Sequence, residues 1–111
     1  TMHEIRCIVF EDGELIKSIL AHSRRTGKAL PAGQISSFEI ERKPEVIARL
    51  TIKSDEGQTS IVPTAGAELA AAMIAYCIDR KVPVPANAAK SIAVLDDHVA
   101  LKITMTGEQT R

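Results

Sequence analysis

The sequence is poor in aromatic side chains. Its 111 residues include two Phe, one Tyr and no Trp, so the core has to be built from aliphatic side chains. The aromatic platforms on which single-strand-binding proteins stack bases are also missing. Lys and Arg together number 14, as do Asp and Glu, which leaves no net charge. These values argue against a strongly basic nucleic-acid-binding domain.

Cysteine is equally scarce. Cys7 and Cys77 are too few and too far apart for a disulfide framework or a structural zinc site. Each falls in an apolar segment, so we expect both to be buried as small hydrophobic side chains. No apolar run approaches the roughly 18 residues of a membrane span, and the first residues lack the pattern of a secretory signal. We therefore expect a cytoplasmic protein with no membrane partner.

Hydrophobic periodicity and breaker residues divide the chain into eight elements. Asp12 is the predicted N-cap of the first helix, and Gly27 is the predicted residue just beyond its end. The length suits a single domain over 1–111, in which we expect the polar residues 106–111 to be frayed. The predicted strands are 5–10, 35–41, 46–53, 59–62, 90–95 and 98–105, and the predicted helices are 13–25 and 65–81.

The chain aligns with itself when Leu15 is placed on Leu69. The same offset places Pro31 on Pro85, and apolar positions coincide over 14–40. We call this offset the repeat shift, and we call the positions that it aligns equivalent. The pattern indicates an internal duplication, with repeats over about 4–53 and 58–105.

The expected fold class is α+β, with two β-α-β-β repeats related by a pseudo-twofold axis. We expect a mainly antiparallel sheet of about six strands with two helices on one face. One repeat has a single apolar helix stripe and a single apolar sheet face, which is too little to fold alone.

The two predicted helices differ in their outer faces. The first is amphipathic, whereas the second is apolar nearly all round, which is typical of a helix that is central or covered by a partner. We expect a homodimer, or another protein partner, to bind through the helix 65–81, with burial inside the chain as the alternative. The residues predicted to mediate self-association are Ala70, Ala71, Ile74 and Ile78.

Basic residues gather where each predicted helix ends. Arg24, Arg25 and Lys28 follow the first helix, and Arg80 and Lys81 stand at the equivalent place in the second. The planar fork of arginine suits a phosphate or carboxylate. Cations at a helix carboxyl terminus also complement its dipole, so a purely structural role is the other interpretation. Weak, salt-sensitive binding of nucleic acid or another anionic ligand is thus the alternative function.

The sequence has no evident catalytic or cofactor motif. Its glycines are scattered without a phosphate-binding pattern, so we expect no cofactor. Asp96, Asp97 and His98 form the tightest carboxylate–imidazole group, but their spacing favours a hairpin turn over a metal site. His22 and Tyr76 are equivalent under the repeat shift and are predicted to form a polar pair between the repeats. An enzyme site there is a second alternative to the main hypothesis, a non-enzymatic binding and assembly module.

Overall fold

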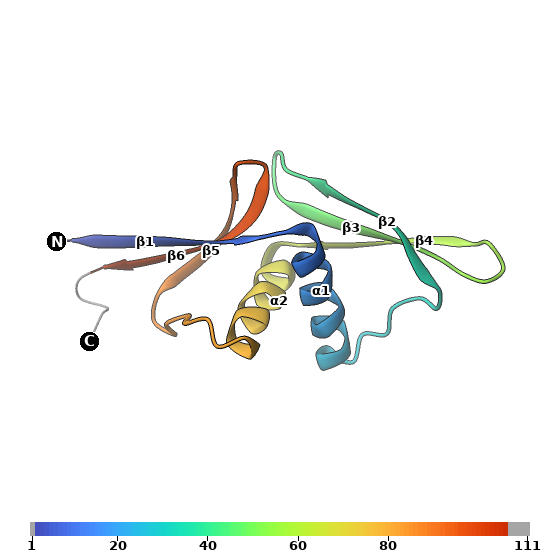
Figure 1. Cartoon of the computed structure of the whole chain (residues 1–111), viewed down its shortest axis with the longest axis horizontal. Coiled ribbons are helices and arrows are strands. Elements are labelled where there is room, and N and C mark those ends of the chain that lie inside the picture. Colours follow the sequence, from blue (N-terminus) through green and yellow to red (C-terminus); the bar gives the residue numbers. More distant parts are fainter. Residues whose placement is uncertain (1, 107–111) are drawn as a thin grey trace.

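Six strands and two helices follow one another in the order β-α-β-β-β-α-β-β (Figure 1). The computed structural model describes residues 2–106, so the predicted frayed segment lies almost entirely outside the described residues. The predicted α+β class is confirmed, and an element is present at each predicted place. The strands are β1 (His3–Phe10), β2 (Gln34–Glu41), β3 (Ile47–Lys53), β4 (Thr59–Ala65), β5 (Ala89–Leu95) and β6 (His98–Thr106), and the helices are α1 (Asp12–Thr26) and α2 (Gly66–Asp79).

The strands form two antiparallel sheets, ordered β1-β6-β5 and β2-β3-β4. The prediction of a single sheet of about six strands is therefore wrong. Each sheet joins the hairpin of one half of the chain to the first strand of the other half, because β1 pairs with β6 and β4 pairs with β3. Alternation of apolar residues sets the buried face of a strand but not its distant partner. Both helices lie on the same side of the strands (Figure 1).

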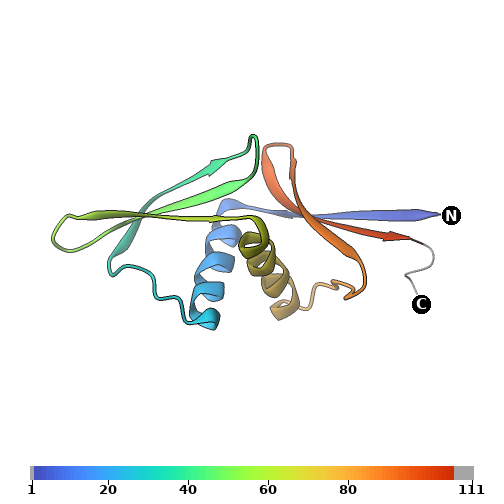
Figure 2. The same cartoon turned by 180° about the vertical axis from the view of Figure 1, so that it is seen from behind.

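The halves have the same strand register. Phe10 pairs with Val99 in one sheet, and its equivalent Thr64 pairs with Ala48 in the other. The hairpins also share their register from Ser37 and Ser91 up to their turns, but β2 has an irregularity between Ile35 and Ser37 that β5 lacks. The turn at 42–46 is longer than the turn at 96–97. Seen from behind, in Figure 2, the chain has nearly the outline of Figure 1, with the two sheets exchanged.

The two helices end in the same way. Gly27 lies in the left-handed region with a φ of 74°, as predicted for a residue just beyond a helix, and its equivalent Lys81 has a φ of 61°. The backbone N–H of Lys28 donates to the carbonyl of Ser23 at 3.1 Å, and that of Val82 donates to the carbonyl of Cys77 at 2.8 Å. These bonds satisfy carbonyls that the helix itself leaves unpaired.

The start of α1 differs from the prediction by one residue. Glu11 is the N-cap, in extended backbone with a ψ of 160°, and its N–H donates to Oε1 of Glu14 at 3.1 Å. Asp12 is instead the first helical residue. Its carboxylate there lies near the positive end of the helix dipole. This position explains an acidic residue as well as the predicted N-cap role does.

The core lies where the helices meet the inner faces of both sheets. The molecule measures 58 × 28 × 18 Å, and its radius of gyration of 15.5 Å exceeds the ~13 Å of a compact chain of this length, because both sheets extend outward beyond the helices. Among residues 2–106, no helix is long and apolar enough to cross a membrane. The largest fully buried side chains are Leu15, Leu50, Leu69, Met73, Leu101, Ile103, Val99 and Ser18.

Only one of the two cysteines is buried. Cys77 lies in the core on α2, and its burial raises the pKa of its thiol. Cys7 is exposed, contrary to the prediction that both are buried. β1 is an edge strand, and Cys7 alternates with the inward-facing Ile8 and Phe10, so it lies on the outer face of the sheet.

Two glycine substitutions are expected to change stability in opposite directions. Gly33 has a φ of 138°, and a β-carbon there would overlap the carbonyl oxygen of Lys53, so Gly33→Ala lowers the free energy of unfolding by roughly 1–3 kcal/mol. Gly13 lies in α1 with open space around it, so Gly13→Ala raises that energy by about 0.5–1 kcal/mol. Urea denaturation of both variants measures the two effects, and equal effects would contradict the backbone geometry at Gly33.

The two thiols are expected to react at very different rates. In the folded protein, a thiol reagent modifies Cys7 at once, because its side chain is exposed. Cys77 reacts only when the chain unfolds, because burial shields it and disfavours its thiolate. Counting released chromophore with and without denaturant measures this, and Cys7→Ser serves as the control that removes the fast reaction alone.

Candidate functional site

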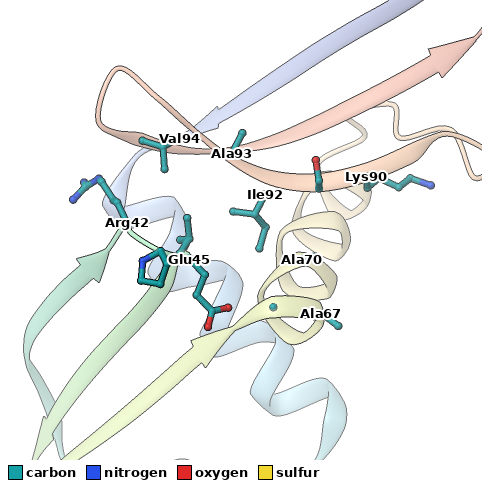
Figure 3. A pocket seen from close by; sticks show the side chains of 12 residues that line it. Arg42, Glu45, Ala67, Ala70, Lys90, Ile92, Ala93 and Val94 are labelled. Carbon is teal, nitrogen blue, oxygen red and sulfur yellow. The ribbon is translucent and has the colours of Figure 1, made fainter.

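An open groove of about 510 Å³ lies between the two hairpins, above the start of α2 (Figure 3). One wall is the segment 42–46 after β2, which contributes Glu45, and the other wall is β5, which contributes Lys90 and Ile92. The floor is the first turns of α2, where Ala67 and Ala70 leave the helix backbone close to the surface. We call this feature the groove.

The groove exists because its side chains are small. Ala70 and Ile92 are the equivalents of Ile16 and Phe38, which pack against the core in the other half. Protein interiors are close-packed, so the smaller side chains at these two positions occupy less of the space beside α2, although Ile92 also packs against the core. The sequence signal for the groove is therefore a difference in side-chain size between aligned positions.

The turns of the two hairpins are tied together beside the groove. The guanidinium of Arg42 donates from Nη2 and Nε to the carbonyl oxygen of Asp97, at 2.6 and 3.0 Å. Asp96 and Asp97 both have positive φ, of 51° and 65°, as in the two-residue hairpin turn that the sequence predicts. This contact fixes the distance between the two sheets at the open end of the groove (Figure 1).

His98, at the end of the same turn, binds two acceptors. Its Nδ1 lies 2.9 Å from the carbonyl oxygen of Asp96, and its Nε2 lies 3.0 Å from Oε2 of Glu11. The bond to Asp96 and the negative charge of Glu11 raise the pKa of His98 above its ordinary value of 6.5. Among residues 2–106, no three His, Cys, Asp or Glu side chains are placed to hold a metal ion.

The residues predicted to mediate self-association lie on the outer side of α2. Ala70 and Ile74 are half-buried, Ala71 is exposed, and Ile78 is 59% exposed. Burial inside the chain, the alternative interpretation, therefore applies fully to the opposite face and in part to Ala70 and Ile74, of which Ile74 packs against the core. The buried residues of that face are Leu69, Ala72, Met73, Tyr76 and Cys77.

The basic ends of the two helices lie at the same end of the helix pair, because α1 and α2 run in the same direction (Figure 1). Three of the five predicted cations bind groups of the protein itself. Arg25 lies 3.5 Å from Asp79, and Lys28 lies 3.1 Å from Glu68. The guanidinium carbon of Arg80 lies 3.6 Å from the ring centroid of Tyr76.

Arg24 and Lys81 are exposed and complete the predicted set of cations. Lys28 is paired with Glu68 and Arg80 contacts the Tyr76 ring, so these two cations do not point toward one shared anion position. An anion at this end would have to compete with Asp79 and Glu68 for its cations. The arrangement thus favours the structural interpretation of the basic cluster.

A second cavity, of about 320 Å³, opens between α1, the segment after it and β4. Its lining is mainly apolar and includes His22, whose Nδ1 is itself buried and has no hydrogen-bond partner among the described residues. The ion pair of Lys28 and Glu68 lies at this cavity. We call it the His22 cavity. Its lining residues are Ile19, His22, Ser23, Lys28, Ala29, Leu30, Pro31, Val62, Pro63, Thr64 and Glu68.

His22 and Tyr76 do not hydrogen-bond to each other within the described part of the chain. The ring of Tyr76 lies 5.8 Å, centroid to centroid, from the ring of Phe10 on the opposite side of the helix pair. His22 instead lines the cavity beside Thr64. No hydrogen bond therefore joins the two side chains, as the predicted polar pair between the repeats would require.

The charge of His98 is expected to depend on Glu11. In Glu11→Gln the pKa of His98 falls toward 6.5, because the neighbouring negative charge is lost. A raised pKa in the folded state means that the pair stabilises the fold fully below the unfolded pKa, and that this contribution disappears as the pH rises through the folded value. An NMR titration of the His98 ring measures the shift, with Glu14→Gln as control, and an unchanged pKa in Glu11→Gln would contradict the contact.

Comparison of the chain with protein-family models, curated proteins and solved structures gives no match. A fold by itself does not determine function. The candidate functional features of this chain are the groove, the outer face of α2 and the His22 cavity.

Proposed function

We propose that this chain is a non-enzymatic binding and assembly module that forms a homodimer through the outer face of α2 and the adjoining groove. One observation carries the proposal. The exposed residues Lys17 and Arg24 of α1 have the exposed residues Ala71 and Ile78 of α2 as their equivalents. The outer face of α1 carries charged residues at these two positions. Folding therefore does not require apolar residues at the equivalent positions of α2. Covering by a partner accounts for them.

The partner that we propose is a second copy of the chain. The floor of the groove, at Ala67 and Ala70, continues the apolar outer face of α2, so a second copy related by a twofold axis covers both with the same apolar surface. A specific interface buries about 800 Å² on each partner, whereas α2 is only about 21 Å long. The interface therefore extends from the helix over the groove and β5.

Internal duplication, with the halves related by a pseudo-twofold axis along the helices, is part of this proposal. It is supported by the repeated order of elements, the shared strand register and the matching helix ends. On this view the two helices began with the same outer face. The charged face of α1 and the apolar face of α2 then reflect different roles, one facing water and the other facing the second copy.

The double variant Ala71→Lys, Ile78→Arg tests the homodimer, because it copies the outer face of α1 onto α2. We expect the dissociation constant of the dimer to rise at least about tenfold. The unfolding midpoint, measured at a concentration below that dissociation constant, stays nearly unchanged, since both positions are exposed. Sedimentation equilibrium over a range of micromolar concentrations measures the dissociation constant.

The matched control is the double variant Lys17→Ala, Arg24→Ala. It changes the charge of the chain by the same amount in the opposite sense and leaves α2 untouched, so we expect it to dimerise like the wild type. Two results would overturn the proposal. One is a wild-type chain that stays monomeric throughout the range, and the other is an unaltered dissociation constant in the α2 variant.

A further inference from the structure

The His22 cavity has a counterpart in the other half of the molecule. A small cavity of about 80 Å³ lies between the end of β1 and α2. Seven of its lining residues have equivalents, under the repeat shift, that line the His22 cavity as well. In chain order these are Ile8, Val9, Phe10, Glu14, Tyr76, Cys77 and Val82, which correspond to Val62, Pro63, Thr64, Glu68, His22, Ser23 and Lys28.

Aromatic rings fill the counterpart. Phe10 and Tyr76 pack with their centroids 5.8 Å apart, and the guanidinium of Arg80 covers the Tyr76 ring at 3.6 Å. Phe10 is 3% exposed and Tyr76 is 7% exposed, so the rings are part of the core. This half shows that the fold can close the site with ordinary side chains.

The His22 cavity lacks all three of these groups. Thr64 stands in place of Phe10, His22 in place of Tyr76, and Thr26 in place of Arg80. The hydroxyl of Thr26 donates to the backbone carbonyl of His22 at 3.0 Å. Thr26 does not line the cavity. The counterpart measures about 80 Å³, whereas the His22 cavity also extends over Ile19 and the segment 29–31 and measures about 320 Å³. That volume is at the lower end of the range for small-molecule sites, and a cavity of about 150 Å³ already holds benzene.

We infer that the His22 cavity binds a small aromatic molecule of one or two rings that carries a hydrogen-bonding group. The ring of the ligand takes the place that the Phe10 side chain fills in the other half, against the apolar side chains of Ile19, Leu30 and Val62. This inference rests on the comparison of the two cavities and is independent of the homodimer.

The hydrogen-bonding group of the ligand follows from His22. Its Nδ1 is buried without a partner in the described part of the chain, and a buried polar atom left unpaired destabilises the fold. With the proton on Nε2, Nδ1 is an acceptor, and a turn of the ring toward the cavity lets a ligand N–H or O–H supply that partner. Because Lys28 and Glu68 neutralise each other at this cavity, at 3.1 Å, the ligand needs no net charge.

Indole serves as the probe, because it joins two fused rings to one N–H donor. We expect a titration of the full chain, followed by two-dimensional ¹H–¹⁵N spectra, to give saturable shifts at the cavity lining with a dissociation constant below about 1 mM. Thr64→Phe restores the ring that the other half has and fills the cavity, so indole binding weakens at least about tenfold. Thr59→Phe, at an exposed position of the same strand, is the matched control and keeps the wild-type affinity.

His22→Leu tests the polar contact and does not depend on whether Thr64→Phe folds. It keeps a side chain of similar size, so we expect weaker binding of indole, by about fivefold or more, and unchanged binding of benzene, which has no donor. The absence of saturable shifts with the wild type overturns the inference. So does wild-type affinity for indole in a folded Thr64→Phe. If Thr64→Phe does not fold, equal effects of His22→Leu on indole and benzene overturn it.

Discussion

The exchange of strands between the two halves is the constraint on which the rest of the structure depends. Neither half completes a sheet of its own, because β1 is an edge of the sheet built on the β5–β6 hairpin and β4 is an edge of the sheet built on the β2–β3 hairpin. Each helix follows such an exchanged strand directly, so the exchange also brings α1 and α2 side by side. A half of about fifty residues buries too little apolar surface to fold alone, and the exchange joins both halves in one core.

Equivalent places with unequal side chains give this fold its candidate sites. Ala70 in place of Ile16 opens the groove, and Thr64 in place of Phe10 opens the His22 cavity. The apolar outer face of α2 arises in the same way, from Ile78 in place of Arg24. For the His22 cavity and the outer face of α2, the other half shows the same place in the fold without the feature. The molecule thus contains an internal reference for these two candidate sites.

Local features of the fold were predictable from the sequence, and distant ones were not. The helix end at Gly27 and the turn at Asp96 depend on the conformational preferences of one or two residues, and both are where the sequence predicts them. The division into two sheets depends on β1 finding β6 at the other end of the chain, which no local pattern encodes. The exposure of Cys7 follows from that pairing, because it makes β1 an edge strand. The alignment of the chain with itself shows Thr64 at the position equivalent to Phe10. That this difference coincides with a cavity is visible only when the packing of both halves is known.

The pairing of His3 with Thr106 also sets the order in which the fold can assemble. On a ribosome, the sheet β2-β3-β4 has all its strands as soon as β4 is made, because these strands follow one another. β1 is synthesised first, and its partner β6 is synthesised last. At about 5–20 residues per second, β6 is complete about 5–20 s after β1. During that time the apolar side chains of β1, Ile8 and Phe10 among them, have no sheet to join. The first strand of the chain is thus the last to find its place.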